Sequence, residues 1–215
     1  MQTAQVCGFT AGMQNNWLIT QLINRTVNGT RLPQVSVLIE FELQNCDVIL
    51  NCQRTFNTHV LEMSEVDPVA ARITTNYRQV SRVSPDITTS ERVNKTVHIN
   101  FDTDNSSFYF AIQDETSCIA LTRVLVFYSV CPKQTSDLIH HPEILAPRAP
   151  TGNQPGGAPV QVTASCVENA TTENGRPPVV FCSSGGTWTK SGKGCQCAPG
   201  HGVNDAETCS RRLRR

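Results

Sequence analysis

Apolar and polar side chains alternate along residues 35–44, which is the pattern of a β-strand that buries one face and exposes the other. Residues 107–114 repeat this alternation, with Phe108, Phe110 and Ile112 on one side. Residues 119–130 are almost continuously apolar and β-branched, which predicts a central strand buried on both faces. A weaker strand is expected over Thr96–Phe101.

The remaining segments favour turns and loops over helices. Only Val66–Ile73 could form a helix, and Pro68 would have to lie in its first turn. Many strands, little helix and polar connections predict a mainly β protein built around a β-sandwich. Ala146–Pro159 is rich in proline and glycine, which predicts an irregular linker. The region beyond it has closely spaced cysteines and no long apolar run, so we expect disulfide bonds to hold it together.

Ten cysteines and five Asn-x-Ser/Thr sequons predict a disulfide-bonded, glycosylated extracellular protein. The competing interpretation is a zinc site at Cys195-x-Cys197 with nearby His201. Finger-type zinc sites need paired spacings that this sequence lacks, so no metal is expected. The cysteines are Cys7, Cys46, Cys52, Cys118, Cys131, Cys166, Cys182, Cys195, Cys197 and Cys209. The sequons begin at Asn24, Asn28, Asn94, Asn105 and Asn169.

The charge balance excludes several classes of partner. Lysine and arginine together number 18, as do aspartate and glutamate, so no net field attracts nucleic acid or an anionic membrane. Residues 1–5 lack the features of a signal peptide, and no segment reaches the ~20 apolar residues of a membrane span. We therefore expect a chain that is incomplete at its N-terminus and meets the membrane only through a span absent from it. No phosphate-binding loop or nucleophile motif occurs, so neither catalysis nor a cofactor is expected.

Several motifs carry a family resemblance. In the N-terminal part these are Gln14-Asn15-Asn16-Trp17-Leu18, Cys52-Gln53-Arg54-Thr55-Phe56-Asn57, Phe108-Tyr109-Phe110-Ala111-Ile112-Gln113-Asp114 with Cys118-Ile119-Ala120-Leu121, and Val126-Phe127-Tyr128 before Cys131-Pro132. In the C-terminal part they are Gly186-Thr187-Trp188 and Cys195-Gln196-Cys197-Ala198-Pro199-Gly200-His201. With these motifs in order, the chain resembles the extracellular region of Eph receptors over essentially its whole length.

The resemblance implies three modules. Residues 1–131 would be a jelly-roll ligand-binding sandwich whose first strands are missing, residues 132–196 a sushi-like module with a proline- and glycine-rich start, and residues 197–215 the beginning of an EGF-like module. It also implies disulfide pairings that the spacing alone leaves open. These are Cys7–Cys118 and Cys46–Cys52 in the sandwich, then Cys131–Cys182, Cys166–Cys195 and Cys197–Cys209.

The resemblance further implies a function in contact-dependent signalling between cells. The ligands would be ephrins, cell-surface proteins whose hydrophobic loop inserts into a channel on the receptor, with receptor self-association as a further expectation. The chain would lie on the extracellular side of the plasma membrane, and the tyrosine kinase of the full receptor would lie outside it. The competing function is a secreted or matrix glycan-binding, adhesive module, because jelly rolls also serve as lectins.

The expected ligand-binding residues surround the Cys46–Cys52 ring. Glu42 and Gln44 share the polar face of the strand before it, which would line the channel or simply face solvent. The ring itself carries three consecutive apolar residues, Val48, Ile49 and Leu50, which would contact a ligand or pack onto the adjacent sheet. Ala120 and Thr122 fall on one face by alternation, and such small side chains would leave room for a ligand loop or allow tight sheet packing.

Two features of this region depart from the family pattern. The Cys46–Cys52 ring is short and lacks the usual insertion containing glycine and proline. Gln44 stands where the family usually has an arginine that pairs with an acidic group of the ephrin loop. A charge-assisted hydrogen bond of this kind contributes about 1.5–3 kcal/mol when it is desolvated. Its loss leaves open which ligands this chain prefers.

Overall fold

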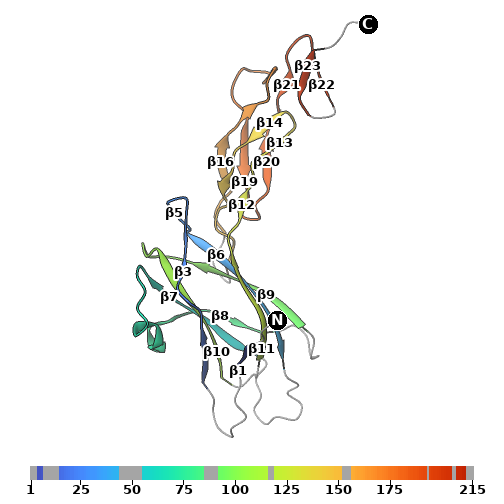
Figure 1. Ribbon diagram of the computed structural model, residues 1–215. Coiled ribbons are helices and arrows are strands. Elements are labelled where there is room, and N and C mark those ends of the chain that lie inside the picture. Colours follow the sequence, from blue (N-terminus) through green and yellow to red (C-terminus); the bar gives the residue numbers. More distant parts are fainter. Residues whose placement is uncertain are drawn as a thin grey trace. The chain divides into compact units, whose positions relative to one another are not determined.

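The computed structural model describes residues 4–6, 15–43, 55–84, 92–115, 119–151, 156–192, 194–204 and 207–211. These residues belong to two compact units, Met1–Tyr128 and Ser129–Arg215 (Figure 1). Strands dominate both units, so the prediction of a mainly β protein is confirmed. We describe each unit by itself.

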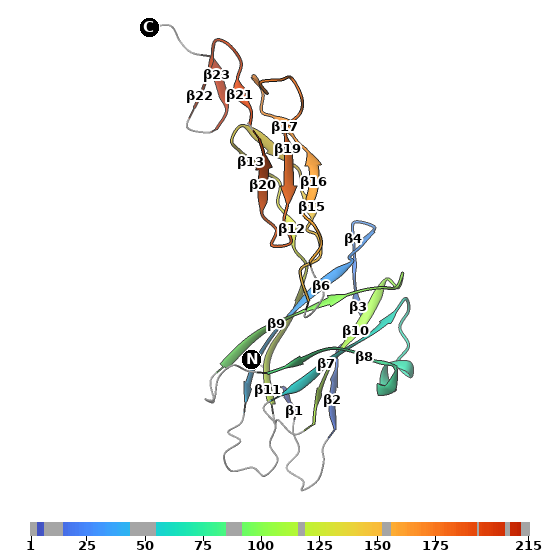
Figure 2. The same cartoon turned by 180° about the vertical axis from the view of Figure 1, so that it is seen from behind.

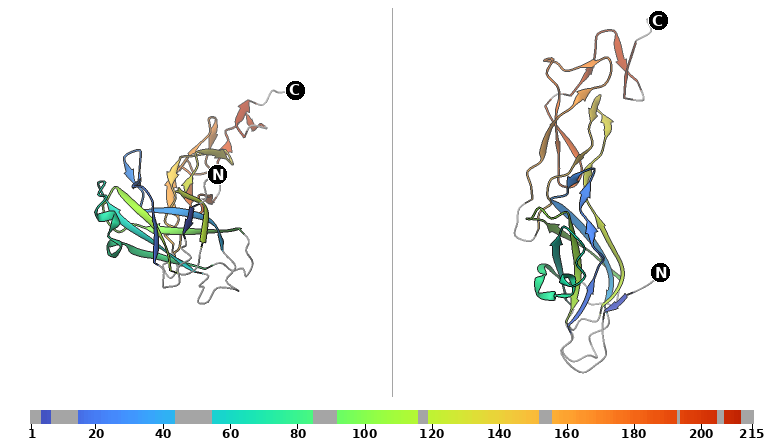
Figure 3. Two further views of the ribbon diagram at one scale, coloured as in Figure 1. Left: turned by 60° about the horizontal axis from the view of Figure 1, so that its bottom comes forward. Right: turned by 60° about the vertical axis from the view of Figure 1, so that its left-hand side comes forward.

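The first unit is a sandwich of two antiparallel sheets (Figure 2, Figure 3). Sheet A has the order β1 (Ala4–Val6), β11 (Ile119–Phe127), β6 (Gln34–Leu43) and β9 (Arg92–Asn100). Sheet B has the order β2 (Asn16–Ile19), β10 (Ser107–Asp114), β7 (Phe56–Met63) and β8 (Arg78–Val83), with β3 (Ile23–Asn24) also pairing with β10. A short hairpin of β4 (Thr26–Val27) and β5 (Thr30–Arg31) follows β3.

The core between the sheets is formed by the alternating apolar positions that the sequence marks. In β6 the odd-numbered side chains Val35, Val37, Ile39 and Phe41 are at most 3% exposed. The rings of Phe41 in sheet A and Phe56 in sheet B meet edge to face at 4.9 Å, which joins the two layers. Buried phenylalanines of β10 complete this core. The predicted strand at 107–114 agrees with β10, and the weaker strand at 96–101 is the second half of a longer β9.

The outer face of sheet B is also covered, which explains why almost all of β10 is buried. Tyr109 and Ala111 pack there against Ala71 and Tyr77, with Trp17 at the edge of the cluster. The covering segment contains two short 3-10 turns, η2 (Ala70–Arg72) and η3 (Thr74–Asn76). Only η2 lies within residues 66–73, where a helix was considered, so a regular α-helix does not form there.

The predicted central strand at 119–130 differs from the structure in length and in burial. β11 ends at Phe127, and a β-bulge shifts its register against β6 between Leu121 and Arg123. Beyond the bulge, Arg123, Leu125 and Phe127 are exposed. The expectation of burial on both faces is therefore wrong, because β11 covers the core with one face only.

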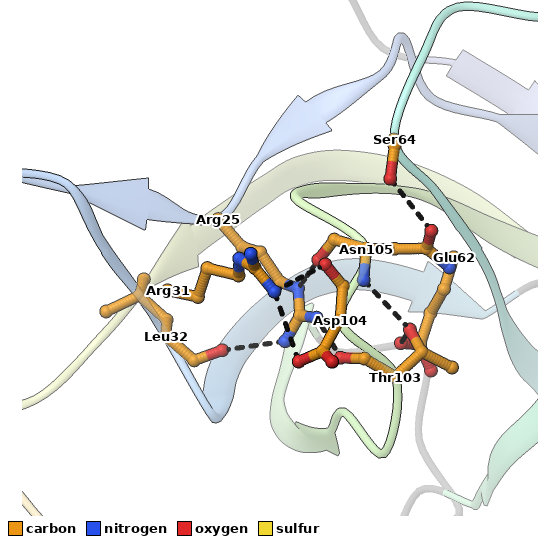
Figure 4. A network of polar contacts seen from close by, with 8 residues as sticks. All are labelled: Arg25, Arg31, Leu32, Glu62, Ser64, Thr103, Asp104 and Asn105. Atoms are coloured by element: carbon orange, nitrogen blue, oxygen red, sulfur yellow. Dashed lines mark hydrogen bonds and ion pairs between the residues drawn. The ribbon is translucent and has the colours of Figure 1, made fainter.

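A buried arginine ties the β3–β5 region to residues 101–105 (Figure 4). The Arg25 side chain is 3% exposed and lies 4.4 Å above the ring of Phe101. Its guanidinium donates hydrogen bonds to the carbonyl oxygens of Leu32 and Asn105, at 3.0 and 2.6 Å, and to that of Thr103. Burial lowers the pKa of Arg25, and the charge of Glu62 acts in the opposite direction.

The second unit consists of small sheets of two or three short strands, and its described residues include two small apolar clusters. Trp188 packs against the cluster of Ile139, Ala164 and Val180, as Trp17 packs in the first unit. The strands are β12 (Val130–Cys131), β13 (Gln134–Ser136), β14 (Ile139–His141), β15 (Ile144–Leu145), β16 (Val160–Thr163), β17 (Ser165–Cys166), β18 (Ala170–Thr171), β19 (Val179–Cys182), β20 (Trp188–Ser191), β21 (Gln196–Cys197), β22 (His201–Val203) and β23 (Cys209–Arg211).

Three disulfide bonds hold these short strands together. They join Cys131 to Cys182, Cys166 to Cys195 and Cys197 to Cys209. These are the pairings that the resemblance implied for this region, and they leave Cys195 and Cys197 unavailable to a metal. The other two expected bonds, Cys7–Cys118 and Cys46–Cys52, lie outside the described residues.

Candidate ligand-binding face

The outward-facing side chains of sheet A form the candidate binding surface. In β6 the even-numbered residues face outward because the odd-numbered ones fill the core. Glu42 lies directly between Ala120 of β11 and Arg92 of β9, and Glu40 lies between Arg123 and Asn94. We call this surface the sheet A outer face. It comprises Leu38, Glu40, Glu42, Arg92, Asn94, Thr96, Ala120, Arg123 and Leu125.

Two ion pairs cross this face on opposite sides of β6. Arg92 Nη2 lies 3.3 Å and Arg92 Nε 3.4 Å from the same carboxylate oxygen of Glu42, Oε1. Arg123 Nη1 lies 3.4 Å from Glu40 Oε1. The side chains of Arg92 and Glu42 are 52% and 47% exposed, so their pairing contributes no more than about 0.2–1 kcal/mol. Arg92 can therefore turn towards an incoming acidic group at little cost in free energy.

Of the expected site residues, the structure describes Glu42, Ala120 and Thr122. Ala120 and Glu42 are directly opposite each other in the pairing of β11 with β6, and both belong to the outer face. Thr122 departs from the alternation because it is the extra residue of the β-bulge, and its hydroxyl donates to the carbonyl oxygen of Glu40 at 3.1 Å. Gln44, Val48, Ile49 and Leu50 lie outside the described residues, and their roles stay predictions.

Arg92 was not among the site residues expected from the sequence. The strand was expected to begin at Thr96, whereas β9 begins at Arg92. Val93, Val97 and Ile99 are buried, and Arg92, Asn94 and Thr96 are exposed, so an alternating signal existed. Lys95 interrupts it, because this cation occupies a position where alternation calls for an apolar residue. A search that tolerated one interruption would have found the longer strand.

A histidine and a serine pair towards the far end of β6 and β9. Ser36 Oγ and His98 Nδ1 form a hydrogen bond of 2.8 Å between β6 and β9. Burial lowers the pKa of His98, so its ring is held in the neutral form more firmly than a free histidine. Ser36 is buried, so this hydrogen bond links β6 to β9 beyond the sheet A outer face and adds no charge there at neutral pH.

The five sequons differ in their surroundings. Asn24, Asn28, Asn94 and Asn169 are exposed, and Asn28 and Asn169 have positive φ angles of 49° and 59°, which asparagine tolerates in tight turns. Asn105 is half-buried, and its Oδ1 accepts a hydrogen bond from Ser64 at 2.9 Å (Figure 4). Asn94 differs from the turn residues because it lies inside a strand. Glycosylation at each of these positions stays a prediction.

The described residues offer no cluster of side chains that could hold a metal ion. No group of three or more potential ligands occurs within that part of the chain. His140 is exposed and His141 is buried, so the two adjacent rings cannot meet at one metal ion. Likewise, no helix in the described ranges is long and apolar enough to cross a membrane.

Comparisons with known proteins identify the two regions. The family model for the ephrin receptor ligand binding domain matches residues 1–131, and that for the ephrin cysteine rich domain matches residues 147–197. Similar proteins include Ephrin type-B receptor 3 of Xenopus laevis, 31% identical over 212 residues, and Ephrin type-A receptor 3 of Danio rerio, 32% identical over 216 residues. Each alignment covers 93% of this chain and 20% of the relative, so the chain spans about a fifth of the relatives it matches.

Proposed function

Because this chain belongs to the ephrin receptor family, we propose that its first unit binds ephrins through the sheet A outer face and the neighbouring segment 44–52. The chain is extracellular and has no catalytic function of its own, since it matches the ligand-binding and cysteine-rich extracellular domains of ephrin receptors, which are not catalytic. We also propose that the chain takes part in signalling in response to cell contact and in receptor self-association. The tyrosine kinase of such a receptor would lie outside this chain.

The observation that carries this proposal is the arrangement around Glu42. A small side chain, Ala120, lies on one side of Glu42, and a half-exposed cation, Arg92, lies on the other. The small residue leaves space above the sheet for a ligand segment. The paired charges can be rearranged by a ligand because both reach solvent. Val48, Ile49 and Leu50 in the adjoining ring would supply apolar burial at about 25 cal/mol per Å².

We infer that Arg92 supplies the cation that the Gln44 position lacks. An acidic side chain of an ephrin loop could pair with the Arg92 guanidinium while Glu42 keeps a single contact. Such a charge-assisted hydrogen bond contributes about 1.5–3 kcal/mol when water is excluded. The relatives include type-A and type-B receptors at similar identity, so the ligand panel has to cover partners of both types.

The glycan-binding alternative gains no support from the placement of the aromatic side chains on sheet B. Trp17, Tyr77 and Tyr109 pack against one another in a covered cluster, and the Trp17 and Tyr77 rings lie 5.7 Å apart. A sugar platform needs such rings to be accessible.

For the chain as a whole, we also propose the three modules set out from the sequence, with boundaries after residues 131 and 196.

The first test is a binding titration of the chain, produced through a secretory pathway, against a panel of soluble ephrin ectodomains. We expect at least one ephrin to bind, and Arg92→Gln to weaken that binding by about 1.5–3 kcal/mol. The affinity should fall with added salt, and less steeply in the variant, because one charged contact is gone.

Arg31→Gln is the matched control, since the Arg31 side chain is 51% exposed and pairs with Asp104 at 3.1 Å outside sheet A. It should bind like the wild type. Ephrin binding that is unaffected by Arg92→Gln would move the site away from this face. A folded protein that binds no member of the panel would contradict the proposed function itself.

A further inference from the structure

The sequon Asn94-Lys95-Thr96 lies within β9 and not in a turn. Asn94 and Thr96 are both exposed, whereas Val93 and Val97 beside them are buried in the core. The inner face of β9 is therefore closed to any attachment. A glycan on Asn94 can project only from the sheet A outer face.

Asn94 is close to the residues that the proposed function assigns to ligand binding. It lies directly opposite Glu40, and Arg92 lies directly opposite Glu42. Opposed residues of neighbouring strands have Cβ atoms about 4.5–5.5 Å apart, and diagonal neighbours about 7–8 Å. Adjacent strands are about 4.7–4.9 Å apart and a strand rises about 3.3 Å per residue, so Ala120, two strands across and two residues along, is ~12 Å away. An N-linked glycan is bulky and strongly hydrated.

We propose that Asn94 carries an N-linked glycan that stands on the sheet A outer face and restricts the access of ephrin to Glu42, Arg92 and Ala120. This inference rests on the proposed function. A ligand segment lying along these residues has to share space with the sugars or confine them, and confining mobile groups reduces affinity. The glycan thus acts as a steric filter, and receptor molecules that lack it bind ephrin more readily.

The test compares glycan removal at Asn94 with removal at a distant sequon. Asn94→Gln and Thr96→Val each abolish the sequon, and valine keeps the β-branched shape that suits a strand. Thr96→Ser keeps the sequon and controls for the change at position 96. Thr30→Val abolishes the sequon at Asn28 in the hairpin before β6. Gln34, where β6 begins, is eight residues or ~27 Å along the strand from Glu42, so the hairpin is far from the site.

Glycopeptide mass spectrometry of the secreted wild-type chain should first find Asn94 occupied. Binding to the ephrin ectodomain that the wild type prefers should then become about threefold to tenfold tighter in Asn94→Gln and Thr96→Val, mainly through faster association. Thr30→Val should bind like the wild type, and Thr96→Ser, which keeps the glycan, should not show the gain seen in Thr96→Val. Trimming the glycans of the folded wild type to their first sugar should reproduce the gain, whereas trimming Asn94→Gln should change nothing.

An unmodified Asn94 overturns the inference. Equal or weaker ephrin binding after loss of the Asn94 glycan also overturns it, while the proposed function stands because the protein still binds. If neither the wild type nor any variant binds an ephrin, the proposed function fails and the inference fails with it. The trimming experiment uses folded protein, so a folding defect in a variant cannot imitate these outcomes.

Discussion

Arg25 shows how one residue can be essential to the fold without belonging to the binding site. Its guanidinium is satisfied by carbonyl oxygens of three separate residues and by the Phe101 ring, and no carboxylate of a described residue forms an ion pair with it. A buried cation without a paired anion is stable only where several hydrogen bonds replace its lost hydration. The three carbonyls belong to the hairpin region and to residues 103–105, so Arg25 fixes these segments together.

Replacing Arg25 by methionine should destabilise the first unit by about 2–4 kcal/mol, because carbonyl groups of Leu32, Thr103 and Asn105 lose their donor. Urea unfolding of the first unit measures the change. Arg31→Met is the control and should stay within about 1 kcal/mol of the wild type, since its pair with Asp104 is exposed. Equal stabilities of the two variants would contradict the role assigned to Arg25.

The burial of individual residues was predicted correctly where hydrophobicity alone decides it. Val35, Val37 and Ile39 were expected in the core and are buried. The burial of Arg25 had no such signal, because its partners are backbone carbonyls that become neighbours only after the chain folds. Arg92 was missed for a related reason, since its proximity to Glu42 follows from the pairing of β6 with β9.

Among the strands, β11 shows that apolar composition alone does not predict which side chains are buried. Its sequence is apolar on both sides, and yet Leu125 and Phe127 are 39% and 37% exposed. The bulge at Thr122 reverses which residues face the core, and apolar composition carries no information about such a shift. Alternation in β6 correctly predicted that Glu42 faces outward. The same alternation applied to β11 was wrong for Thr122, which is the extra residue of the bulge.

Each sheet carries one histidine whose pKa is lowered by burial, His59 in β7 and His98 in β9. The hydrogen bond of His59 with Gln113 and the charge of Glu115 only partly oppose this effect. Both groups bind a proton more readily when unfolded, where the pKa is about 6.5. The free energy of unfolding should therefore fall as the pH drops from 6.5 towards the lowered folded values, and should be fully restored above 6.5.

Urea unfolding of the first unit between pH 5 and pH 7.5 tests this linkage. The double variant His59→Gln, His98→Gln should show a shallower pH dependence, and each single variant an intermediate one. His140→Gln is the control, because this ring is exposed in the second unit. A pH profile of the double variant that parallels the wild type would show that the carboxylates alone produce the acid sensitivity.

At the scale of the whole molecule, the two units are stabilised in different ways. The first unit encloses a continuous core between its sheets, with several phenylalanine and isoleucine side chains fully buried. The described residues of the second unit form two clusters with three buried residues each. Its three disulfides close loops of 51, 29 and 12 residues, and each contributes about 3–4 kcal/mol in the chain-entropy model.

Reduction should therefore unfold the second unit before the first. The chain has two tryptophans, one in each unit, so each can report on its own unit. Trp188 donates to the carbonyl oxygen of Pro132 at 2.8 Å and packs near the Cys166–Cys195 bond, whereas Trp17 lies against His59 at 4.6 Å in the sandwich. In Trp17→Phe, the Trp188 fluorescence should shift at a low concentration of reductant. In Trp188→Phe, the Trp17 fluorescence should persist to a higher concentration, because apolar burial maintains the first unit.

Thiol labelling provides the second measurement and separates bond reduction from unfolding. Without reductant and in denaturant, the ten cysteines should yield no alkylated product, and two or more reactive thiols would disprove the disulfide assignment. With increasing reductant, mass spectrometry should find label at Cys166, Cys195, Cys197 and Cys209 at the concentration where Trp188 responds. A chelator in place of the reductant should leave both fluorescence signals unchanged. If metal ions held the second unit together, the chelator would unfold it and change the Trp188 signal. Simultaneous loss of both signals at one reductant concentration would show that the sandwich depends on its own disulfides as strongly as the second unit does.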